Sequence, residues 1–235
     1  MTQIDVIMPT FNQCEFLKRA VDHILAQTFR DFTFIIVNDG STDNTKNVLE
    51  EYKKIKNIVI IDNEKNKGLP SSLNIGHRNG DSPYCTWVST DNVSYPSQLE
   101  ELHKKITKGD LDFVQSLWVA KNVETGQIYH QDIRRHTENW GMGNLCASFL
   151  YKRKVWETYK YDEEMQTVED LKFYLQAKLH PFKFGHVDIE LVEYYIQGNS
   201  LAGRTPLSEK KHKDNWTNLM SKIYKEVIEP KMRKK

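Results

Sequence analysis

The sequence lacks the patterns that mark several large classes of protein. Its strongest apolar runs, 32–37 and 58–61, are only as long as strands and far shorter than a membrane span. The formal net charge of the 235 residues is +1, so nothing general points to a nucleic-acid partner. Cys14, Cys85 and Cys146 form no CxxC pair, and we expect buried, reduced thiols. The first residues show no basic and apolar signal segment, so the predicted location is the cytoplasm.

Two common nucleotide-binding motifs are also missing. No GxGxxG follows the first apolar run and no GxxxxGK[ST] occurs anywhere, which argues against a Rossmann dehydrogenase and a P-loop enzyme. The loop at 9–12 contains no glycine, so backbone amides are not expected to surround phosphates there. A cation must then neutralise any phosphate ligand, and a metal held by Asp91 is the simplest source of that charge.

Short apolar strands do alternate with amphipathic helices along the first half of the chain. This order, with its short connections, predicts an α/β fold with a parallel sheet and right-handed crossovers. Strands are predicted at 4–8, 32–37, 58–61 and 84–88, and helices at 16–25, 48–52 and 69–78. In the second half we predict helices at 96–107, 152–159 and 167–179, a strand at 146–151, and paired strands at 113–120 and 127–131.

Polar residues follow three of the predicted parallel strands. Thr10 and Asn12 follow the first, Asp39 follows the second, and Asp91 follows the fourth. Open α/β sheets bind ligands at the carboxyl ends of their strands, so these side chains are expected to converge on one site. The alternative is that Asp39 and Ser41 only cap a helix.

A series of short segments resembles the opening of family 2 glycosyltransferases, which have the GT-A fold. The stretch 89–92 with Pro96 falls where that family has its DxD-type metal motif, Glu169-Asp170 falls at its ED motif, and 194–200 resembles its closing Tyr-Arg-x-His-x-x-Ser element. The resemblance covers about residues 3–201 in the family's order. The opening segments are 6–12 (VIMPTFN), 24–29 (ILAQTF), 37–43 (VNDGSTD), 66–68 (NKG), 74–76 (NIG) and 80–84 (GDSPY).

The resemblance implies a GT-A fold and a nucleotide-sugar donor. Its central sheet would be Rossmann-like, mostly parallel and flanked by helices, with a smaller acceptor-side region and a helical tail. Pro9, Thr10 and Phe11 would lie along the nucleobase and ribose. Asp39 would accept a hydrogen bond from the base, typically a uracil imide.

The resemblance also implies the reacting groups. Asp91 would bind Mn²⁺ or Mg²⁺ at the donor diphosphate, with Ser89 and Thr90 on the nucleotide side. Asp170 would be the general base that deprotonates an acceptor hydroxyl, and a single displacement would invert the anomeric carbon. Glu169 would lie nearby.

Trp140 and Gln197 are also placed on the acceptor or diphosphate side by this resemblance. For Trp140 a plain loop is the alternative, and for Glu169 and Asp170 a favourable interaction with a helix dipole is the alternative.

The sequence departs from the family pattern in three places. Ser89 and Thr90 stand where acids occur in relatives, which leaves Asp91 as the one carboxylate of the metal motif. Leu73 stands where many members have Arg. Tyr195 and Gln197 replace the Arg and His of the closing element.

We expect the chain to divide into a nucleotide-sugar-binding half at 1–95, an acceptor-binding half at 96–204, and a basic amphipathic helix at 205–235. That last segment has nine Lys and Arg residues against four acids. Its apolar residues recur at helical spacing, so it can either lie peripherally on an anionic membrane or pack on its own domain. These apolar residues are Trp216, Leu219, Ile223 and Val227.

The predicted activity is that of an inverting, metal-dependent glycosyltransferase, similar to the enzymes of polysaccharide biosynthesis. It would move a sugar from a nucleotide donor, most simply a UDP-sugar, to a saccharide or other hydroxyl acceptor. Two alternatives stay open. A catalytically weak sugar-nucleotide-binding protein would explain the reduced motif at 89–91. A sugar nucleotidyltransferase would need a glycine-rich, basic loop, which 9–12 does not supply. Oligomeric state is not indicated.

Overall fold

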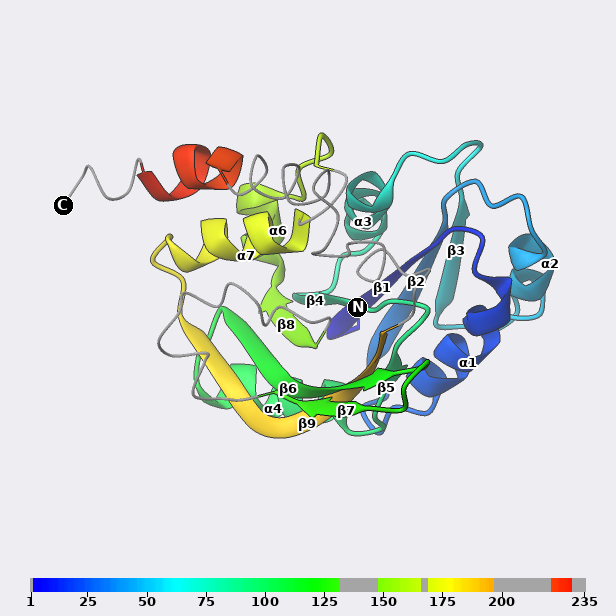
Figure 1. Ribbon diagram of the computed structural model, residues 1–235, viewed down its shortest axis with the longest axis horizontal. Coiled ribbons are helices and arrows are strands. Elements are labelled where there is room, and N and C mark those ends of the chain that lie inside the picture. The colour runs from blue at the N-terminus through cyan, green and yellow to red at the C-terminus, as the bar shows by residue number, and fades with distance from the viewer. Residues whose placement is uncertain (1, 132–147, 166–168, 197–220, 230–235) are drawn as a thin grey trace.

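A curved sheet forms the centre of the molecule in the computed structural model, which describes residues 2–131, 148–165, 169–196 and 221–229 (Figure 1). Within these ranges the sheet has nine strands in the order β3-β2-β1-β4-β8-β6-β9-β5, with β7 paired to β6. The first four strands in the chain are mutually parallel, which confirms the predicted parallel sheet. They are β1 (Ile4–Thr10), β2 (Phe32–Asn38), β3 (Ile58–Asp62) and β4 (Tyr84–Trp87).

The second half of the sheet is mixed. The long strand β6 (Phe113–Asn122) runs parallel to β9 (Phe184–Ile196) and antiparallel to β8 (Phe149–Lys152). A hairpin joins β6 to β7 (Ile128–His130), as predicted. Strand β5 (Val93–Ser94) pairs antiparallel with β9 and thereby ties the chain after β4 to the far end of the sheet.

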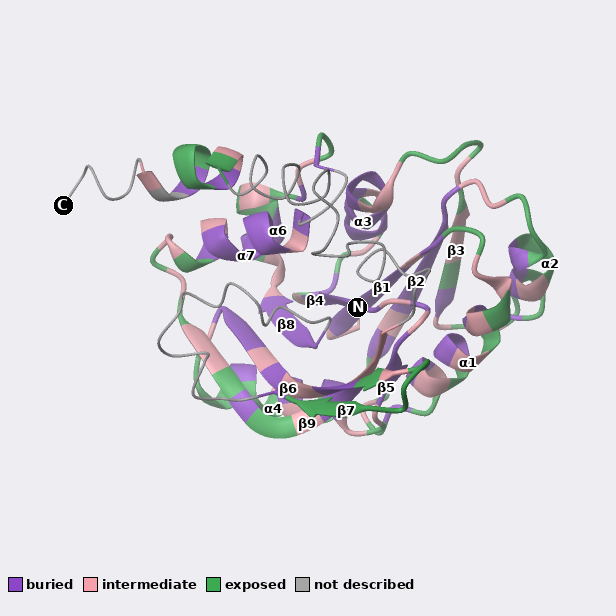
Figure 2. Ribbon diagram, in the orientation of Figure 1, coloured by how far each residue is buried: buried purple, intermediate pink, exposed green. Residues whose placement is uncertain are grey.

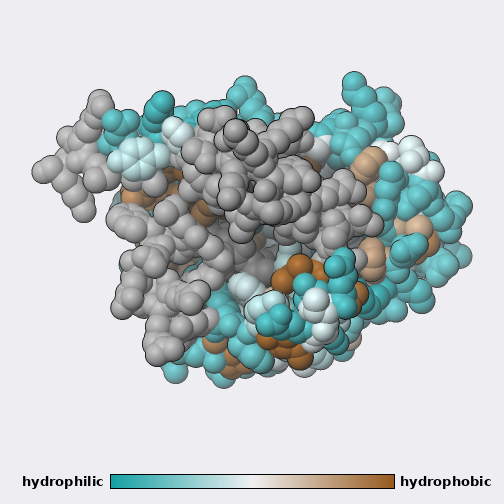
Figure 3. All heavy atoms as spheres, in the orientation of Figure 1, coloured by the Kyte–Doolittle hydropathy of each residue, from teal (hydrophilic) through white to brown (hydrophobic). Residues whose placement is uncertain are grey.

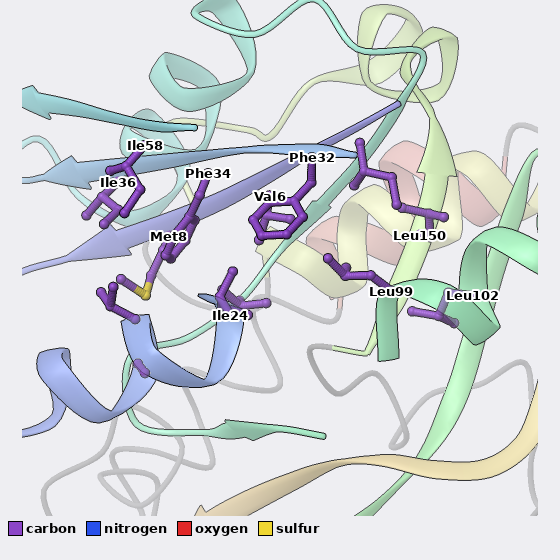
Figure 4. Packing of buried hydrophobic residues seen from close by; sticks show 14 of the residues in the cluster. Val6, Met8, Ile24, Phe32, Phe34, Ile36, Ile58, Leu99, Leu102 and Leu150 are labelled. Carbon is purple, nitrogen blue, oxygen red and sulfur yellow. The ribbon is translucent and has the colours of Figure 1, made fainter. Parts of the chain in front are cut away.

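Helices cover both faces of the sheet because strand side chains alternate in direction. Val6 and Met8 pack towards α1 (Cys14–Leu25), α2 (Thr45–Glu50) and α4 (Gln98–Lys108), as Figure 4 shows for part of this cluster. Ile7 and Val37 point to the other face, which is covered by the remaining helices. These are α3 (Leu69–Arg78), α6 (Arg153–Tyr159) and α7 (Glu169–Lys178).

The burial pattern agrees with this layered arrangement. The central strands are buried and the outer helices expose one side (Figure 2). The face seen in Figure 3 is mainly hydrophilic wherever residues are described, with small apolar patches. Exposed apolar residues of the β6–β7 hairpin include Val123, Ile128 and Tyr129.

Several predicted elements need correction. The helix predicted from Pro96 begins at Gln98, and Pro96 is an exposed residue before the helix. Strands β5 and β9 were not predicted. Cys85 is buried as expected, but Cys14 is only half-buried, and Cys146 lies outside the described residues.

The described part of the C-terminal tail, 221–229, packs against α7 and includes a π-helical turn at Tyr224–Ile228. Ile223 and Val227 are buried in the cluster that contains α6 and α7. Lys172 Nζ of α7 lies 2.7 Å from Glu226 Oε2 of the tail. Trp216 and Leu219 lie outside the described residues. No helix in the described ranges has the length and apolar character of a membrane span.

Candidate functional site

The loops after β1 and β2 are tied together by their own polar residues. Asn12 has a positive φ of 51°, and its Oδ1 accepts hydrogen bonds from the N–H groups of Thr42 at 2.8 Å and Asp43 at 3.3 Å. Ser41 Oγ in turn accepts a hydrogen bond from the Asn12 N–H at 3.0 Å. A short amide side chain tolerates this left-handed backbone and bonds locally. These motif residues therefore fix the shape of the strand-end loops.

Asp39 organises a third loop. Its side chain is 3% exposed, and its two oxygens accept hydrogen bonds from Asn63 Nδ2 at 2.8 Å and from the N–H groups of Lys67 and Gly68, both at 2.9 Å. A carboxylate has about four acceptor positions, so three contacts leave room for a further donor. None of these donors belongs to α2, so Asp39 does not cap the helix that follows it in the chain. Gly68 is instead the N-cap residue of α3, so Asp39 holds the chain that leads into that helix.

The backbone at Gly40 explains why the loops can approach so closely. Gly40 has φ +71°, and a Cβ at this position would lie 2.5 Å from the carbonyl carbon of Lys65. Only glycine combines this conformation with such a close backbone approach. Gly40 is therefore required for this packing, which holds the loop containing Asn63 and Gly68 against Asp39.

The predicted base-side residues lie at the end of β1, between β2 and β4. Pro9 pairs in register with Val37, and the Thr10 carbonyl accepts the Asp39 N–H at 2.9 Å. The Thr10 side chain is buried, and its hydroxyl has no hydrogen-bond partner among the described residues. Phe11 exposes 41% of its surface at the same edge of the sheet.

The turn after β4 holds Asp91 by both its side chain and its backbone. The Ser89 hydroxyl donates a hydrogen bond to Asp91 Oδ1, and Arg19 Nη2 of α1 donates to the Asp91 carbonyl oxygen at 3.4 Å. Thr90 is fully buried and its hydroxyl donates to Gln13 Oε1. The Arg19 guanidinium also lies 5.0 Å from the centre of the Tyr195 ring at the end of β9.

Asp91 is suited to a metal that is completed by a ligand. No group of three or more His, Cys, Asp or Glu side chains comes together as a metal site within the described ranges. Mg²⁺ binds characteristically through one or two carboxylates together with substrate phosphates and water. Asp91 is half-buried, and in the described part of the chain its Oδ2 has no hydrogen-bond partner. The residues present therefore fit a divalent cation that is shared with a diphosphate, and do not fit a cation held by protein alone.

Glu169 and Asp170 form the first turn of α7. Neither carboxyl group forms an ion pair with a described residue, and Asp170 Oδ1 accepts the Leu171 N–H at 2.6 Å. Burial raises the pKa of Asp170 above its ordinary value, although the Leu171 N–H opposes the shift. Burial and then the charge of Asp170 raise the pKa of Glu169. Glu169 is buried and Asp170 is half-buried. Neighbouring carboxyl groups with raised pKa values are typical of an acid–base site.

Two predicted site residues cannot be placed, and two residues that support the site were not predicted. Trp140 and Gln197 lie outside the described residues. Sequence reasoning missed Asn63 and Arg19, which hold Asp39 and the Asp91 turn. Asn63 could have been noticed because it lies two residues beyond a predicted strand, as Asp39 does. The hydrogen bond from Arg19 to Asp91 joins residues 72 positions apart in sequence and carries no local signal.

Comparison with known proteins identifies the family. The model of the glycosyl transferase family 2 domain matches residues 5–182, which is most of the chain. The chain therefore belongs to glycosyltransferase family 2. It is 28% identical over 206 residues to the uncharacterized glycosyltransferase MJ1057 of Methanocaldococcus jannaschii, and the match covers 82% of this chain and 70% of the relative.

Solved structures share the fold. S. aureus TarS 1–349 in complex with UDP-GlcNAc superposes with a TM-score of 0.74 at 19% identity, covering 84% of this chain and 60% of that one. The mannosyltransferase PcManGT from Pyrobaculum calidifontis, in complex with GDP-Man and Mn²⁺, gives a TM-score of 0.66 at 12% identity, covering 85% and 58%. This chain thus spans about three fifths of each of those two crystallised chains, and the GT-A fold predicted from the sequence is confirmed.

Proposed function

We propose that this protein is an inverting, metal-dependent glycosyltransferase that transfers a sugar from a UDP-sugar to a hydroxyl of a saccharide or similar acceptor. The observation that carries the proposal is the strand order β2-β1-β4. It puts Phe11, at the end of β1, between the strand ends that lead to Asp39 and Asp91. One edge of the sheet would thereby offer an aromatic ring, a hydrogen-bond acceptor and a carboxylate that we assign to the metal.

The nucleoside end of the donor is assigned to Phe11 and Asp39. An exposed aromatic ring provides a stacking surface for a base. The remaining acceptor position of Asp39 suits an imide N–H of uracil, and the presence of UDP in the TarS structures supports this choice of base. Pro9 and Thr10 would support the ribose from beneath, because they continue β1 into this loop.

The diphosphate end is assigned to Asp91, which would hold Mn²⁺ or Mg²⁺. When bound, that cation offsets the charge that develops on the departing nucleoside diphosphate. The Ser89 hydroxyl orients the Asp91 carboxylate, and Arg19 fixes the backbone of the turn. Thr90 supports the turn through Gln13 from inside the fold. Direct contacts of Ser89 and Thr90 with the nucleotide stay a prediction.

The acceptor side is assigned to Asp170 as general base. An acceptor hydroxyl is a poor nucleophile, and a carboxylate in hydrogen-bond reach removes its proton as the hydroxyl oxygen attacks the anomeric carbon. Attack opposite to the departing diphosphate inverts that carbon. A raised pKa makes the Asp170 carboxylate a stronger base than an exposed aspartate. Trp140, Glu169 and Gln197 remain proposed neighbours on this side.

Three further expectations concern the whole protein. Cytoplasmic location stays a proposal. Peripheral membrane contact through 205–235 is less favoured than packing on the domain, since Ile223 and Val227 are buried against the α7 side of the core. The halves 1–95 and 96–204 remain a proposed division of labour between donor and acceptor.

The second candidate is a sugar-nucleotide-binding protein with weak catalysis, which the single carboxylate at 89–91 favours. A donor panel separates the two. UDP- and GDP-sugars would be incubated with the protein and Mn²⁺, with and without a set of saccharide acceptors, and followed by mass spectrometry. Release of a nucleoside diphosphate from one donor, lost on addition of a chelator, supports the enzyme. Tight UDP binding by calorimetry with no turnover of any donor supports the binding protein.

A further inference from the structure

Asn74 of α3 uses its whole side-chain amide to hold a distant segment. The side chain is 2% exposed. Its Oδ1 accepts the Tyr161 N–H and the Trp156 indole N–H, both at 3.0 Å. Its Nδ2 donates to the Tyr161 carbonyl at 2.8 Å and to Glu163 Oε1 at 2.9 Å. Two donors and two acceptor sites are the full capacity of an asparagine amide, so every position is used.

This pattern fixes the backbone of Tyr161 in the way a neighbouring strand would. Asn74 contacts both the N–H and the C=O of one residue, which leaves that residue little freedom to rotate or shift. Glu163 is held a second time, because Ser71 Oγ on the same helix donates to its Oε2 at 2.6 Å. Residues 161–163 are therefore bound to α3 along one side.

The Tyr161 side chain is fixed as well. Its hydroxyl lies 3.1 Å from the Tyr151 hydroxyl, which lies 2.6 Å from His77 Nε2. His77 Nδ1 is 2.7 Å from the Leu73 carbonyl, an acceptor, so Nδ1 carries the proton and Nε2 accepts from Tyr151. All three rings are buried, and burial lowers the pKa of His77 to about 3, which keeps the imidazole neutral.

The same segment is joined to α7 from its other side. Lys172 Nζ lies 2.6 Å from Asp162 Oδ2, and the Tyr161 ring stacks on the Phe173 ring with centroids 4.6 Å apart. Lys172 and Phe173 belong to the first half of α7, directly after Glu169 and Asp170. The contacts thus run from α3, on the side of the donor loops, through 161–163 to the helix that begins with the acidic pair.

We propose that Asn74 is a positioning residue that sets the place of Asp170 relative to the donor site by clamping residues 161–163 between α3 and α7. This inference rests on the proposed transfer function. The name Asn74 clamp is used for the four hydrogen bonds of the Asn74 amide. Asn74 touches neither donor nor acceptor in this assignment, so its removal acts on the chemical step through the position of α7 and leaves nucleotide binding intact.

The test compares Asn74→Ala with Asn79→Ala. Asn79 is an exposed asparagine at the end of the same helix, and within the described part of the chain its amide bonds only to the Ile75 carbonyl of α3, at 2.8 Å. Three measurements are made on each variant: hydrogen exchange of peptides spanning 161–165 and 169–178, kcat and donor KM with the donor found in the panel, and UDP binding by calorimetry.

For Asn74→Ala we expect faster exchange at 161–165 and at the start of α7, with strands β1 and β2 unchanged. We expect kcat to fall by at least about tenfold while donor KM and the UDP dissociation constant stay within about twofold. Asn79→Ala should match the parent protein in all three. A kcat within about twofold of the parent, or a loss of UDP binding equal to the loss of kcat, would overturn the clamp.

A second variant guards against misfolding of Asn74→Ala. Glu163 is exposed, so Glu163→Ala opens no cavity. It removes one bond of the Asn74 clamp, together with the Ser71 bond and the Arg78 ion pair that also join Glu163 to α3. It should change exchange at 161–165 and kcat in the same direction by a smaller factor. The proposal would be rejected if hydrogen exchange were unchanged in Glu163→Ala while Asn74→Ala lost protection uniformly over the whole protein. Asn74 would then have only a general role in folding.

The two hypotheses fail in different ways. If the parent protein turns over no donor, the transfer function fails and the positioning role falls with it, while the exchange data still decide whether the Asn74 clamp holds 161–165. If the parent transfers sugar and Asn74→Ala transfers it equally well, the positioning role fails and the transfer function stands.

Discussion

The Ser89 hydroxyl donates a hydrogen bond to Oδ1 of Asp91, two residues further along the same turn. The first position of the predicted metal motif therefore carries a hydroxyl group that orients the Asp91 carboxylate and adds no negative charge to the site. A cation at this site would receive one protein carboxylate and would depend on the donor phosphates for the rest of its negative ligands. Metal and nucleotide binding should consequently be coupled.

Asp91→Ala is expected to abolish the part of UDP binding that depends on Mn²⁺. Calorimetry of UDP with Mn²⁺ and with chelator measures that part, and in the variant the two titrations should coincide. Asp81→Ala is the matched control, since Asp81 is an exposed aspartate at the opposite end of β4. A metal-dependent difference that persists in Asp91→Ala would remove Asp91 as the metal ligand.

Asp170→Asn should separate binding from chemistry. The amide keeps the shape of the side chain and can no longer take a proton, so we expect UDP binding near the parent value and a loss of kcat of roughly 10² to 10⁴. Single-turnover assays with the identified donor measure the chemical step directly. Near-normal turnover would exclude Asp170 as the base.

The pH dependence of the parent enzyme follows from the raised pKa of Asp170. A general base works only when deprotonated, so kcat should rise with pH until that raised pKa has been passed and then level off. The rising limb should lie at higher pH than the ordinary aspartate range near about 4. A pH–rate profile already flat above that range would show that the pKa of the essential base is not raised.

The carboxyl groups of Glu169 and Asp170 should lower the stability of the folded protein. Because burial raises their pKa values, the folded state binds protons more tightly than the unfolded state, and stability falls as pH rises through the folded pKa values. Glu169→Gln and Asp170→Asn remove that cost, so both variants should have a higher Tm than the parent at pH 8 and a smaller difference at pH 4. Equal Tm differences at both pH values would contradict the assignment. Glu157→Gln, an exposed glutamate on α6, is the control.

Much of the donor half could be predicted from the sequence, and the reason is local. The strands β1 to β4 are short apolar runs that end in turn residues, so pattern alone indicates both the strands and the polar groups at their ends. The long strand β9 was not predicted, because charged and exposed residues interrupt its apolar pattern. Its register with β6 also shifts around Ser116 and Leu117. Strand β5 has two residues, too few to show any period.

The contacts that support the site were less accessible to sequence reasoning. Asn74 and Tyr161 are 87 positions apart, and a side-chain amide that binds a remote backbone leaves no local pattern. The asparagine of the NIG segment could be matched to a family, but its physical task appears only when α3 and residues 161–163 are seen together.

Gly40→Ala tests whether close backbone packing is required for the base side of the site. Alanine would have to adopt φ +71° and would place its Cβ 2.5 Å from the Lys65 carbonyl carbon, so the 63–68 loop must move away from Asp39. Gly126→Ala is a matched control, because Gly126 has φ +70° and a Cβ there meets nothing within 4 Å.

Backbone strain alone should cost each variant about 1 kcal/mol of unfolding free energy. Gly40→Ala should lose more than that in urea unfolding and should also weaken UDP binding in calorimetry, whereas Gly126→Ala should bind UDP as the parent does. Equal behaviour of the two variants would mean that the contact between the Gly40 turn and the Lys65 backbone does not shape the nucleotide site.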